Sequence, residues 1–230
     1  MTSKEILADI KTIFSDKWTS RAGRDVPDVE TVRLGNDAVT ISGTVLYADM
    51  ADSTGLVNGF RNTFAAEIYK AYLVGACKVI RKNGGEVTAF DGDRVMAVFN
   101  NSTKNTSAAK SALQINYLVR EINSLIKLSY PNTTYTLNQT VGIDTSDLFV
   151  AKTGIRSYND LVWVGRAANY AAKLCAIGDA SFPSYITEAV FNSMNEEAKF
   201  GGELRSPMWE KRIWTERGIA VYRSSWWWKF

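Results

Sequence analysis

The spacing of hydrophobic residues along the chain separates predicted helices from predicted strands. Apolar residues three or four positions apart predict helices, and short apolar runs between turn residues predict strands. The predicted helices cover residues 3–20, 60–82, 106–128, 167–175 and 188–197. The predicted strands cover residues 38–48, 86–90, 94–99, 134–143, 161–164, 185–187, 211–214 and 219–223.

The order of these elements predicts an α+β fold. Asn83-Gly84-Gly85 ends one long helix, and Asp91-Gly92 joins the next two strands as a hairpin. Strands mixed with helices and hairpins predict a mainly antiparallel sheet, with helices packed on one side. Residues 1–36 are expected to form a helical arm and a polar linker, and residues 37–230 one main domain. The Trp-rich tail, residues 226–230, is expected to dock on the fold or on a partner subunit.

The composition predicts an ordinary folded protein and excludes several classes. With 46% hydrophobic and 22% charged residues in 230, the chain can form a real core. The formal charge of +3 is too balanced for a protein whose main partner is a nucleic acid. No apolar stretch reaches the length of a membrane span, and the first residues are too polar for a signal peptide. A cytoplasmic location is therefore expected.

The chain contains no histidine, which removes mechanisms that use an imidazole, including Ser-His and Cys-His pairs. Its two cysteines, Cys77 and Cys175, lie in apolar helical patterns and are expected to be buried free thiols. Catalysis must then depend on carboxylates, lysine, arginine, hydroxyl groups or thiols.

Two carboxylates are placed where chemistry is plausible. Asp49 ends an apolar strand and runs into small polar residues, and Asp93 lies at the turn of the predicted hairpin. If the strands are neighbours, the two acids converge and suit a pair of Mg²⁺ or Mn²⁺ ions, which prefer oxygen ligands. Such a pair can align a hydroxyl group and a leaving pyrophosphate. Taken singly, an aspartate at a turn is more often a capping residue.

Four ordered segments make the chain resemble the class III nucleotidyl cyclases. The similarity extends over about residues 40–223 and is clearest in four motifs. They are Tyr47-Ala48-Asp49-Met50, Phe90-Asp91-Gly92-Asp93 with Val98-Phe99, Val141-Gly142-Ile143-Asp144-Thr145, and the segment 163–174. The resemblance implies the ferredoxin-like fold of that family and a homodimer with two sites at its interface.

The resemblance also implies roles for individual residues. Asp49, Met50 and Asp93 of one subunit would hold two Mg²⁺ or Mn²⁺ ions. The following loop, Ala51, Asp52, Ser53 and Thr54, would bind the triphosphate. Asn169 of the other subunit would orient the ribose, and Lys173 stands where the family has an arginine that stabilises the transferring phosphate. Lysine supplies the charge without the bidentate geometry. Arg166, Lys211 or Arg217 are further candidates for the pyrophosphate.

The positions that select the base differ from those of purine cyclases. They are Ala89 and Val162, and neither carries the polar partner expected for adenine or guanine. Tyr47 and Arg94 are unusual for the family, and a guanidinium can donate to the carbonyl groups of a pyrimidine. Alternatively, Arg94 is an ordinary ion-pair residue and Tyr47 an ordinary core residue, and neither contacts the base.

Together these features resemble the Pycsar bacterial antiphage pyrimidine cyclases. The resemblance implies conversion of UTP to 3′,5′-cyclic UMP and pyrophosphate. A cytidylate cyclase acting on CTP and an adenylate cyclase with a relaxed pocket remain alternatives. A catalytically inactive nucleotide-binding module is the alternative from a different class. A phosphotransferase of polymerase-palm type would need a nucleic-acid track, which the charge balance does not provide.

Overall fold

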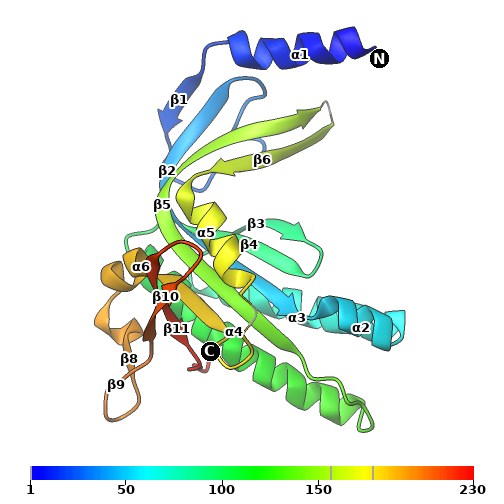
Figure 1. Ribbon diagram of the computed structural model, residues 1–230, viewed down its shortest axis with the longest axis vertical. Helices are drawn as coiled ribbons and strands as arrows, with labels where there is room; N and C mark the ends of the chain where they lie inside the picture. Colours follow the sequence, from blue (N-terminus) through cyan, green and yellow to red (C-terminus); the bar gives the residue numbers. More distant parts are fainter. Residues whose placement is uncertain (1, 156, 178) are drawn as a thin grey trace.

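The computed structural model describes residues 2–155, 157–177 and 179–230. Within them, nine strands form one sheet in the order β10-β11-β7-β5-β2-β4-β3, with β1 beside β2 and β6 beside β5 (Figure 1). The strands are β1 (Thr19–Ala22), β2 (Asp37–Ala51), β3 (Glu86–Asp91), β4 (Arg94–Phe99), β5 (Asn138–Ile155), β6 (Tyr158–Val164), β7 (Ser184–Thr187), β10 (Glu210–Trp214) and β11 (Ile219–Ser224). The short pair β8 (Phe200–Gly201) and β9 (Ser206–Pro207) stands apart.

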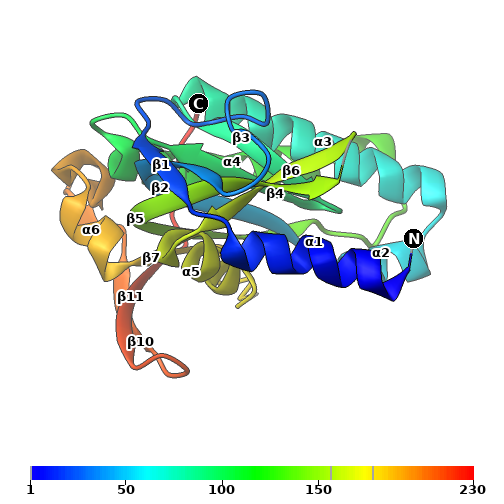
Figure 2. The ribbon, with the colours of Figure 1, turned by 90° about the horizontal axis from the view of Figure 1, so that it is seen from above.

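The helices are α1 (Ser3–Ser15), α2 (Ser53–Gly59), α3 (Asn62–Lys82), α4 (Lys104–Ser129), α5 (Arg166–Cys175), α6 (Glu188–Ser193) and the 3₁₀ helix η1 (Glu196–Ala198). Helices pack on both faces of the sheet, which corrects the prediction of helices on one side. Buried residues of α3 and α4 form the larger core cluster, whereas α5 packs on the opposite face (Figure 2). The α+β class and the mainly antiparallel sheet are as predicted.

Alternation along β2 decides which side chains meet which helices. Leu46, Ala48 and Met50 face α3 and α4 and belong to the larger core cluster. Val45 and Tyr47 face the other way and pack with the cluster that contains α5. Because side chains alternate along a strand, Asp49 shares the face of Tyr47. This face, covered only in part by α5, is the one that carries the candidate site.

The helix α5 lies directly on the backbone of β5, and Gly142 makes this close contact possible. A Cβ atom at Gly142 would lie 2.1 Å from the carbonyl oxygen of Ala171 and 2.4 Å from the amide nitrogen of Cys175. No side chain fits at that distance, so the glycine here is set by packing. Gly142 is also the β5 partner of Tyr47 in the sheet, so the contact fixes α5 close to the candidate site.

A buried ion pair anchors the first turn of α5. Asp144 is fully buried and accepts hydrogen bonds from Nε of Arg166 at 3.0 Å and from the Thr187 hydroxyl at 2.5 Å. The same guanidinium donates to the carbonyl of Thr145 at 2.8 Å. Breaking such a pair would leave an unpaired buried charge. The contacts of Arg166 and Asp144 therefore hold α5, β5 and β7 together. This structural role makes Arg166 a weaker candidate for binding pyrophosphate.

Several element boundaries differ from the predicted ones. The first helix ends at Ser15, and part of the expected polar linker forms β1, which pairs with β2 in parallel. The fifth strand extends to Ile155, well beyond the predicted end, because its second half pairs with β6. The short strands β8 and β9 were not predicted. Cys175 is buried as predicted, but Cys77 is only half-buried.

The Trp-rich tail docks on α4, as predicted for docking on the fold. The amide of Trp228 donates to the carbonyl of Leu113 at 3.1 Å. The side chain of Asn116 donates to the carbonyl of Trp226 at 2.8 Å. Both tryptophan rings pack against the larger core cluster. The tail therefore covers part of α4 and leaves the opposite face of the sheet free.

Candidate active site

Three charged residues predicted for the site come together at one edge of the sheet. Asp49 near the end of β2 is the direct partner of Arg94 at the start of β4. Asp93 lies in the turn just before Arg94. Asp93 lies close enough to Asp49 for its negative charge to help raise the pKa of the Asp49 carboxyl, in agreement with the predicted convergence.

The electrostatics of the two acids suit a cation. Burial raises the pKa of the Asp49 carboxyl to about 6, and the negative charge of Asp93 adds to this shift. The Oδ2 atom of Asp93 is buried and has no hydrogen-bond partner among the described residues. Buried polar atoms are normally paired, so an unpaired carboxylate oxygen next to a second carboxylate indicates a missing positive ligand. The residues present therefore fit a divalent metal ion.

The rest of a metal site would have to come from the main chain and the substrate. Among the described residues there is no cluster of three Asp, Glu, Cys or His side chains that could hold a metal. The Met50 side chain is buried in the larger core cluster, so only its main-chain carbonyl can serve as the predicted ligand. Few protein ligands are typical of Mg²⁺ sites that are completed by phosphate oxygens and water.

Because protons and metal compete for the same oxygen atoms, the raised pKa of Asp49 predicts a pH dependence. We expect Mn²⁺ affinity to be constant above about pH 7 and to fall by up to about tenfold per unit below about pH 6. Without metal, the stability of the protein should instead decrease as pH rises. Ionising an acid whose folded pKa lies above its unfolded value of about 3.9 costs stability, so unfolding free energy should decrease between about pH 4 and 6.

Both trends are measurable with the same samples. Mn²⁺ binding can be followed by electron paramagnetic resonance across this range, and unfolding by urea titration without metal. The Asp49→Asn variant should lose both trends, whereas Glu203→Gln, at an exposed position, should keep them. Mn²⁺ affinity that is the same at pH 5 and pH 7 in the wild type would contradict the assignment.

Arg94 and Tyr47 form a second contact beside the carboxylates. The guanidinium carbon of Arg94 lies 5.3 Å from the centre of the Tyr47 ring, and an ion pair joins Arg94 to Asp91. The Nε atom of Arg94 is buried without a partner among the described residues. The Arg94 N–H group can donate a hydrogen bond to a planar polar ligand that stacks beside the Tyr47 ring.

Of the two predicted base-selecting positions, one lies beside Tyr47 and the other does not. Ala89 packs against the same cluster as Tyr47, together with Leu161 and Trp163 of β6. Val162 lies between these two residues, so its side chain points to the opposite face of β6. It lines a cavity with Trp18 and Phe149 instead. Within one chain Val162 is thus separated from Tyr47, and its place in a base pocket stays a prediction.

The predicted triphosphate loop connects β2 to α2. Asp52 has a positive φ of 55°, and its carboxylate accepts a hydrogen bond from the amide of Gly55 at 3.1 Å. Ala51 and Asp52 line a cavity of about 300 Å³ together with Tyr135. The Tyr135 hydroxyl is buried without a partner among the described residues, and burial raises its pKa to about 12. Tyr135 was expected only as part of the predicted strand 134–143, so its place in this cavity was missed. Ser53 and Thr54 form the first turn of α2.

Asn169 and Lys173 lie on α5, whereas the carboxylates lie on β2 and in the β3–β4 turn. Asn169 and Lys173 are four residues apart and therefore share the exposed face of α5. Among the described residues neither forms a hydrogen bond or ion pair with Asp49 or Asp93. Whether these two groups belong to one site, shared between subunits, stays a prediction.

Two buried polar residues near the site were missed by the sequence analysis. The hydroxyl of Tyr72 in α3 and the carboxamide of Gln139 in β5 are buried and have no partner among the described residues. Gln139 is the strand partner of Met50. A polar glutamine within an otherwise apolar predicted strand could have marked Gln139 as a candidate. Tyr72 gave no such signal, because it fits the apolar stripe of its helix.

Comparison with known proteins identifies the family. No family model matches the chain. It is 49% identical over 220 residues to a uridylate cyclase of Xanthomonas perforans, with 94% of each chain covered. It is 45% identical over 217 residues to a uridylate cyclase of Burkholderia cepacia, with 94% of this chain and 93% of the relative covered. The chain belongs to the uridylate cyclase family. The predicted enzyme class, a nucleotidyl cyclase, is thereby confirmed.

The fold of this uridylate cyclase family member is also confirmed. A bacterial light-regulated adenylyl cyclase is similar with a TM-score of 0.69 and 20% identity, covering 81% of this chain and 52% of the other. This likeness shows the class III cyclase fold. In the described part of the chain, no helix is long and apolar enough to cross a bilayer.

Proposed function

We propose that the chain converts UTP to 3′,5′-cyclic UMP and pyrophosphate at two sites in a homodimer. The observation that carries the proposal is the grouping of Asp49, Asp93 and Arg94 at one edge of the sheet, beside Tyr47. The high identity to uridylate cyclases supports the choice of base. CTP remains the nearest alternative substrate, followed by ATP.

Each part of the reaction has residues to carry it. Two bound Mg²⁺ or Mn²⁺ ions would activate the 3′-hydroxyl and neutralise charge on the phosphates. Asp49, Asp93 and the carbonyl of Met50 would hold them. The loop from Ala51 to Thr54 would bind the triphosphate. The 3′-hydroxyl gives up its proton to solvent as its oxygen forms a bond to the α-phosphorus. The bond from that phosphorus to the bridging oxygen breaks, and pyrophosphate leaves.

The second subunit would complete the site. Its Asn169 side chain can hydrogen-bond the ribose and so orient the 3′-hydroxyl for attack. Its Lys173 ammonium can stabilise negative charge that develops on the transferring phosphate. Both residues are exposed on α5 and free to face a partner. The half-sites on one chain therefore support a head-to-tail dimer.

The first experiment is incubation of the purified protein with ATP, GTP, CTP and UTP in equal amounts with Mn²⁺, followed by mass spectrometry of the products. Cyclic UMP as the main product is the expected result. Cyclic CMP or cyclic AMP would keep the metal site but overturn the choice of base. Absence of any cyclic product would favour the inactive binding module.

The role of Arg94 in base choice is tested by Arg94→Met, which keeps most of the aliphatic stem. We expect the preference for UTP over ATP to fall by about tenfold or more, because a guanidinium donor to the base is lost. Arg212→Met serves as the control, because it removes an exposed arginine that pairs with Glu210 in β10. An unchanged nucleotide profile in Arg94→Met would remove Arg94 from the base pocket.

The inactive module is a second candidate because Lys173 replaces the family's arginine. Such a module would be stabilised by nucleotide and Mn²⁺ without forming product. The pair of metal-binding carboxylates is complete in this chain, which favours an enzyme. Turnover measured in the nucleotide panel distinguishes the two candidates.

The biological role we propose is synthesis of a second messenger in bacterial antiphage defence. It rests on the resemblance to Pycsar cyclases. The measurement is the cyclic UMP content of cells before and after phage infection, in strains with the wild type or the Asp93→Asn variant. A rise on infection with the wild type alone is expected.

A further inference from the structure

The N-terminal helix α1 presents an uncovered apolar face. None of its thirteen residues, all described by the structure, is buried. The Phe14 side chain is 85% exposed and Leu7 is 64% exposed, and Ile6, Ile10 and Ile13 are also exposed. A helix this short is marginal in water and depends on packing of its apolar face. We therefore expect another surface to cover the apolar face of α1 in the functional protein.

The helix is nevertheless held in a defined position. Its first turn carries a capping box formed by Thr2 and Glu5. At the other end, the Asn36 side chain donates to the carbonyl of Ile13 at 2.9 Å and to that of Asp16 at 2.8 Å. Trp18 contacts the ring of Phe149 edge-on, with ring centres 5.2 Å apart. The attachment at one end fixes α1 while its apolar face stays open.

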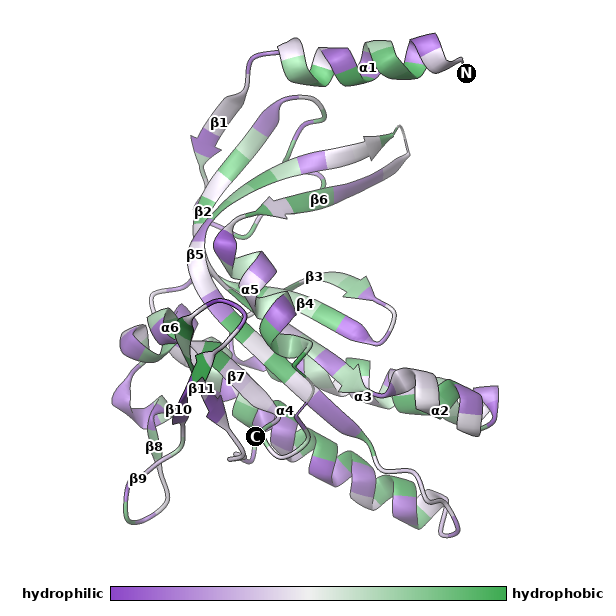
Figure 3. Cartoon of the chain, viewed as in Figure 1, coloured by the Kyte–Doolittle hydropathy of each residue, from purple (hydrophilic) through white to green (hydrophobic). Residues whose placement is uncertain are grey.

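A groove runs between α1 and the β5–β6 hairpin. This cavity has a volume of about 980 Å³. Ile13 and Trp18 line one side, and Val162 and Val164 line the other. The outer ends of the hairpin, Ile155 and Tyr158, are also exposed. Figure 3 shows the hydrophobic positions on α1 and along β5 and β6. Both walls of the groove are thus apolar.

The groove lies on the side of the sheet where the partner subunit is expected. Figure 2 shows α1 on the same side as α5, opposite α3. The strand β6 runs through Gly165 directly into α5, whose exposed face carries Asn169 and Lys173. A second copy that places its own α5 over Asp49 meets this side of the molecule. The groove is therefore continuous with the dimer interface of the proposed function.

We propose that α1 of each protomer packs into the groove between α1 and the β5–β6 hairpin of a second copy. The exchange is reciprocal, as a two-fold interface requires. It covers the apolar face of α1 and both walls of the groove. The inference rests on the proposed function, because it uses the dimer that joins the two half-sites.

The charge of α1 favours a second copy over a lipid surface. Residues 3–17 carry three basic and three acidic side chains. They are Lys4, Lys11, Lys17, Glu5, Asp9 and Asp16. Helices that lie on anionic membranes need an excess of basic residues. A neutral helix with both signs is instead suited to pack against an identical helix.

The first test compares Ile10→Asp with the matched control Lys11→Asp. Both positions are exposed in the single chain, so neither change should affect its folding. Sedimentation equilibrium should show dimer dissociation about tenfold or more easier for Ile10→Asp, because a charge enters an apolar contact. The control should dissociate like the wild type. Equal behaviour of the two variants overturns the proposal.

The second test locates the contact between chains. Chains with Ile10→Cys are mixed with chains carrying Val164→Cys, and a disulfide between them is expected under mild oxidation. Each variant alone controls for Cys77, which is half-buried. No cross-link in the mixture overturns the proposal. Loss of binding to anionic vesicles in Ile10→Asp, with unchanged dimerisation, would assign the face to a membrane and also overturn it.

The same samples separate this inference from the proposed function. If the wild type makes cyclic UMP as a dimer, but neither test shows a contact of α1, the exchange is wrong and the enzyme assignment stands. If no cyclic product forms, the enzyme assignment fails whatever the position of α1.

Discussion

Asparagine in place of Asp93 is expected to abolish cyclic UMP formation while the protein remains folded. The change removes a carboxylate whose Oδ2 atom is buried and unpaired among the described residues. Since metal ions supply charge neutralisation that protein groups cannot replace, we expect a loss of more than about a hundredfold in kcat. Removing the negative charge also takes away a cause of the raised pKa of Asp49. Unfolding free energy without metal should therefore be unchanged or higher.

Activity and stability must be measured on the same preparation. Product formation is followed by mass spectrometry and unfolding by urea titration. Glu203→Gln, which changes an exposed carboxylate outside the site, should match the wild type in both. Substantial turnover by Asp93→Asn at saturating Mn²⁺ would show that Asp93 is not a metal ligand.

Two inactive variants are expected to restore activity when mixed. Asp49→Asn damages the half-site with the carboxylates, and Asn169→Ala damages the half-site on α5. In a mixed dimer one site receives both defects and the other receives none. With random exchange of subunits, about a quarter of the wild-type activity should return.

The outcome depends only on how the half-sites are shared. If one chain supplied the whole site, every site in the mixture would carry a defect and activity would stay at the level of the separate variants. A mixture of Asp49→Asn with Asp93→Asn is the control, because both defects fall in the same half-site. Recovery in that control would contradict the division of the site between chains.

The parts of the fold that depend on local pattern could be predicted from the sequence. The hairpin β3–β4 was predicted because Asp91-Gly92 interrupts two apolar runs. The second half of β5 was not, since its pairing with β6 is a contact between segments whose own patterns are weak. The same holds for β1, a polar segment that is extended only because β2 lies beside it. Pairing between strands overrides local preference in such places.

In the candidate site, too, local sequence pattern predicts some features, whereas others depend on strand pairing. Asp49 and Asp93 could be found because a carboxylate at the end of an apolar run stands out in the sequence. Their approach follows from the pairing of β2 with β4. The face to which Val162 points could not be found, since it depends on the register of β6. A shift of one residue reverses the direction of a side chain.

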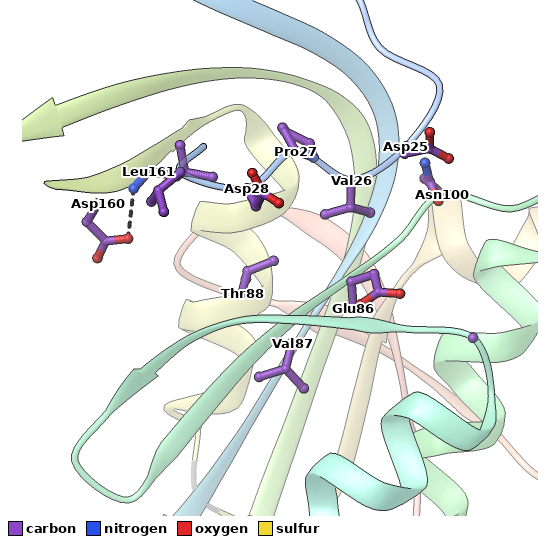
Figure 4. Close-up of a pocket in the computed structure, with 12 residues that line it drawn as sticks. Asp25, Val26, Pro27, Asp28, Glu86, Val87, Thr88, Asn100, Asp160 and Leu161 are labelled. Carbon is purple, nitrogen blue, oxygen red and sulfur yellow. Dashed lines mark hydrogen bonds between the residues drawn. The ribbon is translucent and has the colours of Figure 1, made fainter. Parts of the chain in front are cut away.

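A hollow of about 530 Å³ near the β3–β4 hairpin contains none of the predicted site residues. Figure 4 shows Asp25, Glu86 and Asp160 around it, between the segment 25–29 and β3. These side chains are acidic and would repel a triphosphate. This agrees with the proposal that the nucleotide binds beside Asp49 and Arg94 instead.

The close contact at Gly142 has a consequence for reading mutational scans of this enzyme. Any side chain there would collide with the backbone of α5 and displace the helix that presents Asn169 and Lys173. Variants at this position would score as inactive even though glycine binds no ligand. Intolerance to substitution next to the site would then report how the helix is seated, and ranking residues by lost activity alone would count a packing constraint as chemistry.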